Sequence, residues 1–358
     1  VPGVVRSFLL QPGQLRERMF VDVPAGATSM QVVFASDLPV DVYLSTADRA
    51  ADWSISPAPA RNLAAVSRLQ VVGDATLSVS GASLTPGRWY VTTVNGAALP
   101  ATVTVSASIA AQAPVVRSGS YFNADRSGHG IFLYPAGDQV AGIWYTYLPG
   151  GEATWYYLQG TKPGANGVWS SSVYRSVWDG SSNKLTAIGT AVITPTGADA
   201  FSFSYSVDGR TASERMANLG RGCPTIGGVP QDLSSHWFNP AMSGTGYSVQ
   251  FWSNYEFYAA FVYDANGYAR FLTAERAGFG GGNATVQLEQ LKGFCPGCAR
   301  SGAPTRTVVG TFGRTISGGT LSRLVLDGTY VDGVRGAWQA DEAVQTLGGP
   351  GTTQGCQL

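Results

Sequence analysis

The sequence predicts an all-β protein, in which a jelly-roll-like β-sandwich is followed by two tandem eight-stranded antiparallel meander barrels. Three observations predict this fold class. Gly or Pro interrupts most windows before an amphipathic helix could develop. Apolar and polar side chains alternate with a period of two, as in residues 201–208, which is typical of strands with one buried face. Residues 122–155 also recur without gaps as residues 238–271.

Joints that contain Pro and Gly, at 113–114 and 223–230, divide the chain into three expected domains. These are residues 1–112, 113–222 and 223–358. In the first, residues 102–109 alternate Thr or Ser with Val, Ala or Ile, as a strand with one wet face does.

Three motifs mark the first domain: FVDVPAG at 20–26, DVYL at 41–44 and GRWYV at 87–91. They resemble the bacterial pre-peptidase C-terminal domain, a small jelly-roll β-sandwich found on secreted hydrolases. That family sometimes binds Ca²⁺, so the resemblance leaves a Ca²⁺ site open here. Asp22, Asp37 and Asp41 nevertheless do not form an oxygen-ligand loop motif.

The other two domains share the pattern Phe-Asn-x3-Ser-Gly-x-Gly, followed by an aromatic strand, a turn and a further strand. In the first copy we expect strands near 118–123, 129–135, 139–148, 152–159, 167–177, 184–194, 199–207 and 211–219. Their short joints force neighbours in sequence to pair. A meander of eight strands with aromatic residues on both faces favours a closed barrel, with a two-sheet sandwich as the alternative.

Residues 121–130 and 144–155 carry the motifs of a further resemblance. They are similar to a repeat common at the C-terminal ends of secreted proteins from Gram-negative soil bacteria, which implies no activity. The same segment is distantly similar to avidin-type barrels. That likeness implies that Asn123 and Ser127, and their counterparts Asn239 and Ser243, point into a barrel mouth; it does not favour biotin as the ligand.

Aromatic side chains are dense on neighbouring strands of both copies, and the alternation sends Trp144 and Tyr147 to opposite faces. One face must be core, and the other is a solvent-facing strip that binds a ligand or a surface buried against a neighbouring domain. A ligand site built on these features consists of Asn123, Ser127, Trp144, Tyr147, Trp155, Asn239, Ser243 and Tyr263.

No motif for catalysis stands out. His129 shares a strand face with Ser127, but the second copy keeps Ser243 without a histidine, so we interpret this pair as turn or surface residues. His236 has no histidine counterpart in the first copy. Four glutamates lie on or near strands and could form a glycosidase pair, but none recurs in both copies, so we interpret them as surface residues. They are Glu152, Glu256, Glu275 and Glu289.

The chain contains four cysteines, which we interpret as the disulfides Cys223–Cys356 and Cys295–Cys298. The first would join the two ends of the third domain, which adjoin in a closed barrel. Cys295–Cys298 is also the spacing of a redox pair or of half a zinc site. A Gly/Pro loop in a β domain favours the disulfide, and disulfides are typical of exported proteins.

Charged residues make up 13% of the 358 residues, against roughly 25% in typical soluble domains. Twenty-three basic residues balance twenty-three acidic ones, which argues against a nucleic-acid partner and a polybasic membrane anchor. No apolar run approaches the roughly 20 residues of a membrane span. We interpret residues 1–3 as the mature end after signal-peptide removal, although an engineered boundary would look the same, and expect a secreted or cell-surface protein.

These features predict a secreted, non-catalytic binding or adhesion module that recognises a glycan or a surface polymer. A self-associating subunit of an extracellular filament or surface layer is the first alternative, because exposed strand edges invite strand addition. A secreted hydrolase whose site has no sequence motif is the second.

Overall fold

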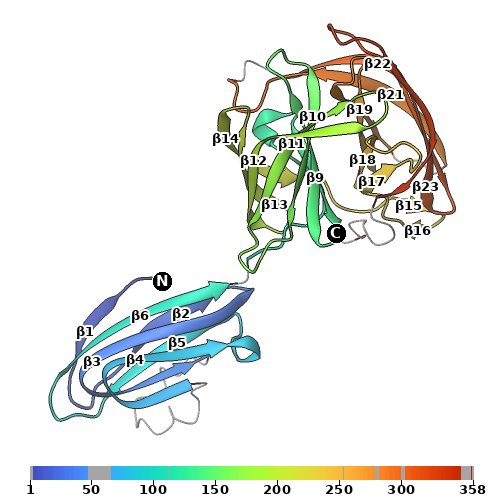
Figure 1. Ribbon diagram of the computed structural model, residues 1–358. Coiled ribbons are helices and arrows are strands. Elements are labelled where there is room, and N and C mark those ends of the chain that lie inside the picture. The colour runs from blue at the N-terminus through green and yellow to red at the C-terminus, as the bar shows by residue number, and fades with distance from the viewer. Residues whose placement is uncertain are drawn as a thin grey trace. The chain divides into compact units, whose positions relative to one another are not determined.

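The computed structural model describes residues 3–46, 66–111, 113–252, 254–278, 282–299, 303–347 and 356 (Figure 1). The chain forms two compact units, Val1–Gln112 and Ala113–Leu358. The fold is all-β, as the sequence predicts, because the described residues form strands and two single-turn 3₁₀ helices but no α-helix. No helix in this part of the chain is long or apolar enough to cross a membrane.

The first unit is a six-stranded antiparallel sheet in the order β1-β6-β3-β5-β2, with β4 paired to β3. Its elements are β1 (Arg6–Leu10), β2 (Leu15–Val23), β3 (Ala27–Ser45), β4 (Val66–Ser80), η1 (Gly81–Ser83), β5 (Gly87–Asn95) and β6 (Ala101–Ala111). The long strand β3 pairs with β6 over its first half and with β5 over its second, and its pairing with β4 shifts register between Ser36 and Val42. One hydrophobic core takes side chains from all six strands.

The first barrel is closed, so its eight strands leave no free sheet edge. Its elements are β7 (Gly119–Phe122), η2 (Ala124–Arg126), β8 (Gly130–Ala136), β9 (Gln139–Tyr147), β10 (Ala153–Thr161), β11 (Trp169–Trp178), β12 (Asn183–Gly197), β13 (Ala200–Val207) and β14 (Arg210–Asn218). All eight predicted strands are present, and no end differs from the prediction by more than three residues. The two-sheet sandwich is thereby excluded for this repeat.

The second barrel corrects the prediction of another eight-stranded barrel, because it contains nine strands in the order β24-β23-β22-β21-β20-β19-β18-β17-β25. Its strands are β17 (Ser235–Phe238), β18 (Gly246–Trp252), β19 (Tyr255–Tyr263), β20 (Ala269–Ala277), β21 (Asn283–Lys292), β22 (Thr305–Ser317), β23 (Thr320–Thr329), β24 (Ala337–Ala343) and β25 (Gln345–Thr346). The strand that corresponds to β14 is interrupted at Val344. Its first part, β24, pairs with β23, and its second part, β25, pairs with β17, so the barrel is nearly closed.

The joint before the second barrel holds a two-stranded ribbon, β15 (Thr225–Ile226) and β16 (Val229–Pro230). Both predicted disulfides are present. Cys223 lies two residues before this ribbon, and its disulfide with Cys356 spans a separation of 133 residues. The disulfide therefore links the start and the end of the second barrel, where backbone pairing through β25 is short.

Alternation divides the aromatic side chains between the barrel interiors and the space between the barrels. In the first barrel, one buried cluster takes residues from all eight strands and fills the interior, with Trp144 against Phe203 and Tyr205 at ring-centre distances of 4.9 and 4.7 Å. A corresponding cluster fills the second barrel. A third cluster joins the outer faces of β8–β10 to those of β19–β21. Both faces of these strands are therefore buried.

Both barrels keep a β-bulge at the same place, after which Gly189 and Gly310 lie against the backbone of the next strand. A Cβ at Gly310 would lie 1.8 Å from the carbonyl oxygen of Asp327, whereas at Gly313 the nearest atom is 3.5 Å away. We expect Gly310→Ala to lower the free energy of unfolding by about 2 kcal/mol, because the backbone must shift. Urea denaturation checks this, and an equal loss for the control Gly313→Ala would contradict it.

Candidate functional site

The structure buries the four aromatic residues that the sequence analysis placed in a ligand site. Trp144 is 1% exposed inside the first barrel. Tyr147, Trp155 and Tyr263 are at most 3% exposed and lie in the layer between the barrels. The Trp155 indole Nε1 donates to the carbonyl oxygen of Val262 at 3.1 Å, which ties the two barrels together. In this arrangement Tyr147, Trp155 and Tyr263 stabilise the packing of the two barrels against each other.

The repeated Asn positions build turns. The Oδ1 atom of Asn123 accepts from the backbone N–H of Asp125 at 2.9 Å, and that of Asn239 accepts from Ala241 at 3.0 Å. Such a side-chain turn explains why both copies keep asparagine. Asn123 also donates to the Glu214 carboxylate at 3.0 Å. The structure places the repeated serines, Ser127 and Ser243, on the surface.

The histidine and glutamate interpretations need correction. His129 is buried, and its Nδ1 lies 3.0 Å from the Thr146 hydroxyl. Glu256 is fully buried rather than on the surface, and it accepts two hydrogen bonds from Arg314, at 2.9 and 3.0 Å. A carboxylate in a barrel interior needs such a partner to offset its desolvation.

One carboxylate that recurs in both barrels was not identified from the sequence. Glu214 pairs in register with Phe203 and Glu342 with Leu324, at corresponding places of the last strand in each barrel. Both are buried, and each accepts a tyrosine hydroxyl. The connection between β23 and β24 is longer than that between β13 and β14, which shifts the alignment of the two copies before this strand. A comparison without gaps could therefore not find the pair.

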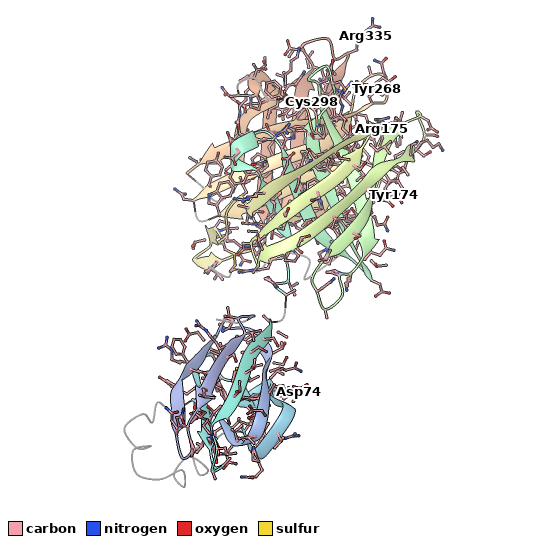
Figure 2. The ribbon with its side chains drawn as sticks, turned by 90° about the vertical axis from the view of Figure 1, so that its left-hand side faces the viewer. Asp74, Tyr174, Arg175, Tyr268, Cys298 and Arg335 are labelled. Carbon is pink, nitrogen blue, oxygen red and sulfur yellow. A yellow bond between two sulfur atoms is a disulfide. The ribbon has the colours of Figure 1, made fainter. Side chains whose placement is uncertain are left out.

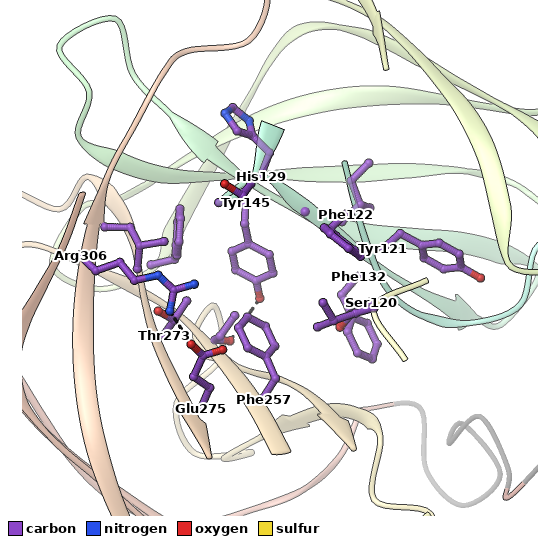
Figure 3. A pocket seen from close by; sticks show the side chains of 18 of the residues that line it. Ser120, Tyr121, Phe122, His129, Phe132, Tyr145, Phe257, Thr273, Glu275 and Arg306 are labelled. Carbon is purple, nitrogen blue, oxygen red and sulfur yellow. Dashed lines mark hydrogen bonds and ion pairs between the residues drawn. The ribbon is translucent and has the colours of Figure 1, made fainter. Parts of the chain in front are cut away.

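A pocket of about 260 Å³ lies between the outer faces of the two barrels (Figure 3). The first barrel supplies β7, β8, β9 and the turn that contains Ser127, and the second supplies β18–β22. Its aromatic lining residues are Tyr121, Phe122, Phe132, Tyr145, Trp252, Tyr255, Phe257 and Phe271. Strand alternation explains the wall on β19 and β20, because Tyr255 and Phe257 are two positions apart and share the outer face.

Charged and polar groups gather at one end of this pocket. The Arg306 Nη1 donates to Glu275 at 2.5 Å and to Glu289 at 3.1 Å. Tyr255 donates its hydroxyl to Glu275 at 2.5 Å. Burial, with the neighbouring Glu275 carboxylate, raises the pKa of Tyr255 above its ordinary value, so the phenol remains a hydrogen-bond donor at neutral pH.

The hydroxyl of Thr273 lines the pocket beside this charged group, and Figure 3 shows it near Arg306 and Glu275. Thr273 is 6% exposed, and its Oγ1 has no hydrogen-bond partner in the described part of the protein. A buried hydroxyl without a partner costs about 1–3 kcal/mol. A ligand that hydrogen-bonds to Thr273 would recover this cost.

Next to this charged group lies a pair of stacked rings, Trp252 and Tyr255, whose centres are 4.3 Å apart. The indole packs closely on Gly220, where any Cβ would collide with it. Trp252 and Arg306 were not singled out from the sequence. A half-buried Trp at the end of a strand belongs to no sequence motif. Arg306 reaches Glu275 only because β20 and β22 lie on either side of β21 in the sheet.

Cation ligands do not converge in the described residues, which contain no group of three or more His, Cys, Asp or Glu residues that could hold a metal ion. In the first unit, the Asp22 carboxylate pairs with Arg88 at 2.8 Å. Asp37 accepts from the Thr102 backbone N–H at 2.7 Å, and Asp41 accepts from that of Gln70 at 2.9 Å. The three carboxylates thus serve separate contacts.

The chain matches no family model, and no curated protein matches it in sequence. The resemblances to the pre-peptidase C-terminal domain and to avidin-type barrels therefore stay predictions. An assignment of function has to start from the chemistry of the pocket, because a fold alone does not define an activity.

Proposed function

We propose that this protein is a secreted, non-catalytic binding module that holds one sugar unit of a glycan or surface polymer between its two barrels. The observation that carries the proposal is the Thr273 hydroxyl, which lies unpartnered in a pocket with aromatic walls and a charged end. Aromatic faces pack on apolar C–H surfaces, while Glu275 and Arg306 offer acceptors and donors to neighbouring hydroxyl groups. A sugar ring presents both kinds of surface.

The size of the pocket favours a small ligand or a single unit of a polymer. Its volume of about 260 Å³ lies just below the range of roughly 300–1,000 Å³ for small-molecule sites. Two features support secretion: the chain has few charged residues, and its cysteines form disulfides, which persist in oxidising compartments. The resemblance of residues 1–112 to a domain of secreted hydrolases points the same way.

Trp252→Ala is expected to weaken glycan binding about tenfold, because the substitution removes one ring of the stacked wall. Thr273→Val is expected to weaken it as well, without loss of stability, because the valine leaves no unpaired hydroxyl. A panel of soluble oligosaccharides, followed by titration calorimetry with the best binder, measures both effects.

Tyr268→Ala is the matched control, because this ring is 51% exposed and outside the pocket (Figure 2). Absence of binding to every glycan class of the panel would contradict the proposed function. Equal losses for Tyr268→Ala and Trp252→Ala would show that the pocket is not the site.

Self-association remains an alternative, for which the first unit supplies an observation. Strands β1 and β2 stand at the ends of its sheet order, and Val5 and Leu9, at the β1 end, are 64% and 54% exposed. Strand addition uses such edges. Electron microscopy and light scattering of the purified chain distinguish this alternative, since a monomer at high concentration contradicts it.

A hydrolase is the second alternative, because Glu275 lines the pocket and Glu289 lies next to it, paired with the same Arg306. Two carboxylates beside a bound sugar are the groups that glycoside hydrolysis requires. Incubation of the bound glycan with the protein separates the two activities: intact glycan supports a binding module, and new reducing ends support the hydrolase.

A further inference from the structure

The connection between β21 and β22 leaves the second barrel and contacts the first. The backbone N–H of Gly293 donates to the carbonyl oxygen of Gly151 at 3.0 Å, and Lys292 forms an isolated antiparallel bridge with Glu152. Gly293 lies so close to the Tyr147 ring that a Cβ would collide with it. The start of this connection is therefore held against the first barrel.

The next turn of the same connection reaches side chains at the end of the first barrel. The carbonyl oxygen of Cys295 accepts from the Arg126 Nη2 at 3.1 Å. The backbone N–H of Gly297 donates to the Tyr205 hydroxyl at 3.0 Å. Tyr205 in turn donates to the buried Glu214 carboxylate at 2.8 Å, and Arg126 lies 3.8 Å from the same carboxylate. Two side chains thus connect this turn to a carboxylate of the first barrel.

The Cys295–Cys298 disulfide closes this turn, together with a backbone hydrogen bond of 3.0 Å from Cys298 to Cys295. It therefore fixes the backbone that carries both contacts to the first barrel. Cys295 is 4% exposed, whereas Cys298, labelled in Figure 2, is half-buried. Leu291 before the turn and Arg306 after it both line the pocket.

We propose that the Cys295–Cys298 disulfide is a thiol-exchange site, and that its reduction by a dithiol releases this turn from the first barrel and loosens the pocket. The effect on the pocket rests on the proposed function. A thiolate of the dithiol attacks Sγ of Cys298, the more accessible cysteine, and Cys295 leaves as a thiolate that takes a proton. The second thiol then displaces Cys298. The dithiol becomes a disulfide, and the two cysteines receive two electrons and two protons.

Reduction at this site acts locally. The two cysteines are only 3 residues apart, whereas Cys223 and Cys356 are 133 apart. Because the chain entropy that a disulfide removes grows with the length of the closed loop, opening the short ring changes the turn and leaves the barrels folded. The contacts of Gly293, Cys295 and Gly297 with the first barrel are the ones that loosen.

Hydrogen exchange of the full chain tests the release directly. In the double variant Cys295→Ser/Cys298→Ser, the amides of Gly293 and Gly297 are expected to exchange about tenfold faster than in the wild type. We expect wild-type protein treated with dithiothreitol to show the same faster exchange. This measurement tests the release of the turn if the double variant does not fold. Cys223→Ser/Cys356→Ser is the matched control, in which these amides stay protected. Unchanged exchange of both amides in reduced protein would overturn the proposal.

Glycan affinity then tests the link to the pocket, with the oligosaccharide that the wild type binds best. We expect the double variant to bind it about fivefold more weakly, because the flanking Leu291 and Arg306 are less firmly held. Faster exchange with unchanged affinity overturns control of the pocket. If the wild type binds no glycan, the proposed function fails, and the amide exchange alone confirms or overturns the thiol-exchange site.

Discussion

Replacing Trp155 by alanine is expected to lower the free energy of unfolding by about 4 kcal/mol, the loss typical of a buried Trp replaced by Ala. Trp155 is 3% exposed, and its ring centre lies 5.7 and 5.6 Å from those of Phe261 and Tyr263. The substitution also removes the hydrogen bond to Val262. The loss therefore arises where the two barrels meet, and urea denaturation followed by circular dichroism measures it.

Trp252→Ala is the appropriate control for this experiment, because the side chain is half-buried at the pocket and is not part of the buried hydrophobic cluster that joins the two barrels. We expect it to lose much less stability than Trp155→Ala. Trp155→Phe should lie between the two, since it keeps an aromatic ring but lacks the N–H donor. A loss below about 1 kcal/mol for Trp155→Ala would contradict the packing of the barrels through this ring.

Acidification is expected to destabilise the protein through His236, by up to about 1.4 kcal/mol for each pH unit between about 6.5 and 3. This ring is 1% exposed and lies among Phe132, Tyr134 and Phe261, with centre distances of 4.4, 4.3 and 5.6 Å. Its Nδ1 is 3.0 Å from the Ser248 hydroxyl, and its Nε2 has no hydrogen-bond partner within the described ranges.

Burial lowers the pKa of His236 from 6.5 to about 3, against a smaller opposing effect of a hydrogen bond with the Tyr247 backbone. The unfolded chain therefore binds a proton below about pH 6.5 that the folded protein excludes. Stability from this group is complete above about pH 6.5 and is lost progressively as the pH falls towards 3.

His236→Asn separates this effect from that of the carboxylates, which also titrate in acid. Asparagine keeps a polar group near the Ser248 hydroxyl but cannot take up a proton in this range. We expect the variant to be less stable at pH 7, because the ring leaves a cavity, and to show a smaller loss between pH 7 and pH 4. Denaturation at both values measures the difference, and equal losses in variant and wild type would contradict a neutral His236.

The local alternation of apolar and polar residues, together with the short joints, was sufficient to predict the strands of the first barrel. Residues 199–207, for example, alternate without interruption and have short joints on both sides, and the structure places β13 at Ala200–Val207. The last strand of the second barrel was not predictable in this way. Whether β24 continues into β25 depends on Val344, whose backbone N–H donates to the Ser322 carbonyl oxygen at 3.1 Å.

Most of the candidate site could not be predicted from the sequence. The aromatic density of the repeated strands is visible, but alternation alone does not say whether the outer rings meet solvent or a second barrel. Glu275 was identified as a strand residue, yet its partners Tyr255 and Arg306 are 20 and 31 residues away. Such contacts can be predicted only when both the strand pairing and the packing of the barrels are known.

The sequence by itself determined that the chain is all-β, that one strand pattern occurs twice after residue 113, and that four cysteines form two disulfides. These follow from periodicity, turns and spacing, which act between neighbours in the chain. Only the tertiary structure decided that Trp155 and Tyr147 lie between the barrels, and that Thr273, Glu275 and Arg306 line one pocket. The outer face of a strand has the same alternation whether it meets water or another barrel, so only the packing of the two repeats settles what it contacts.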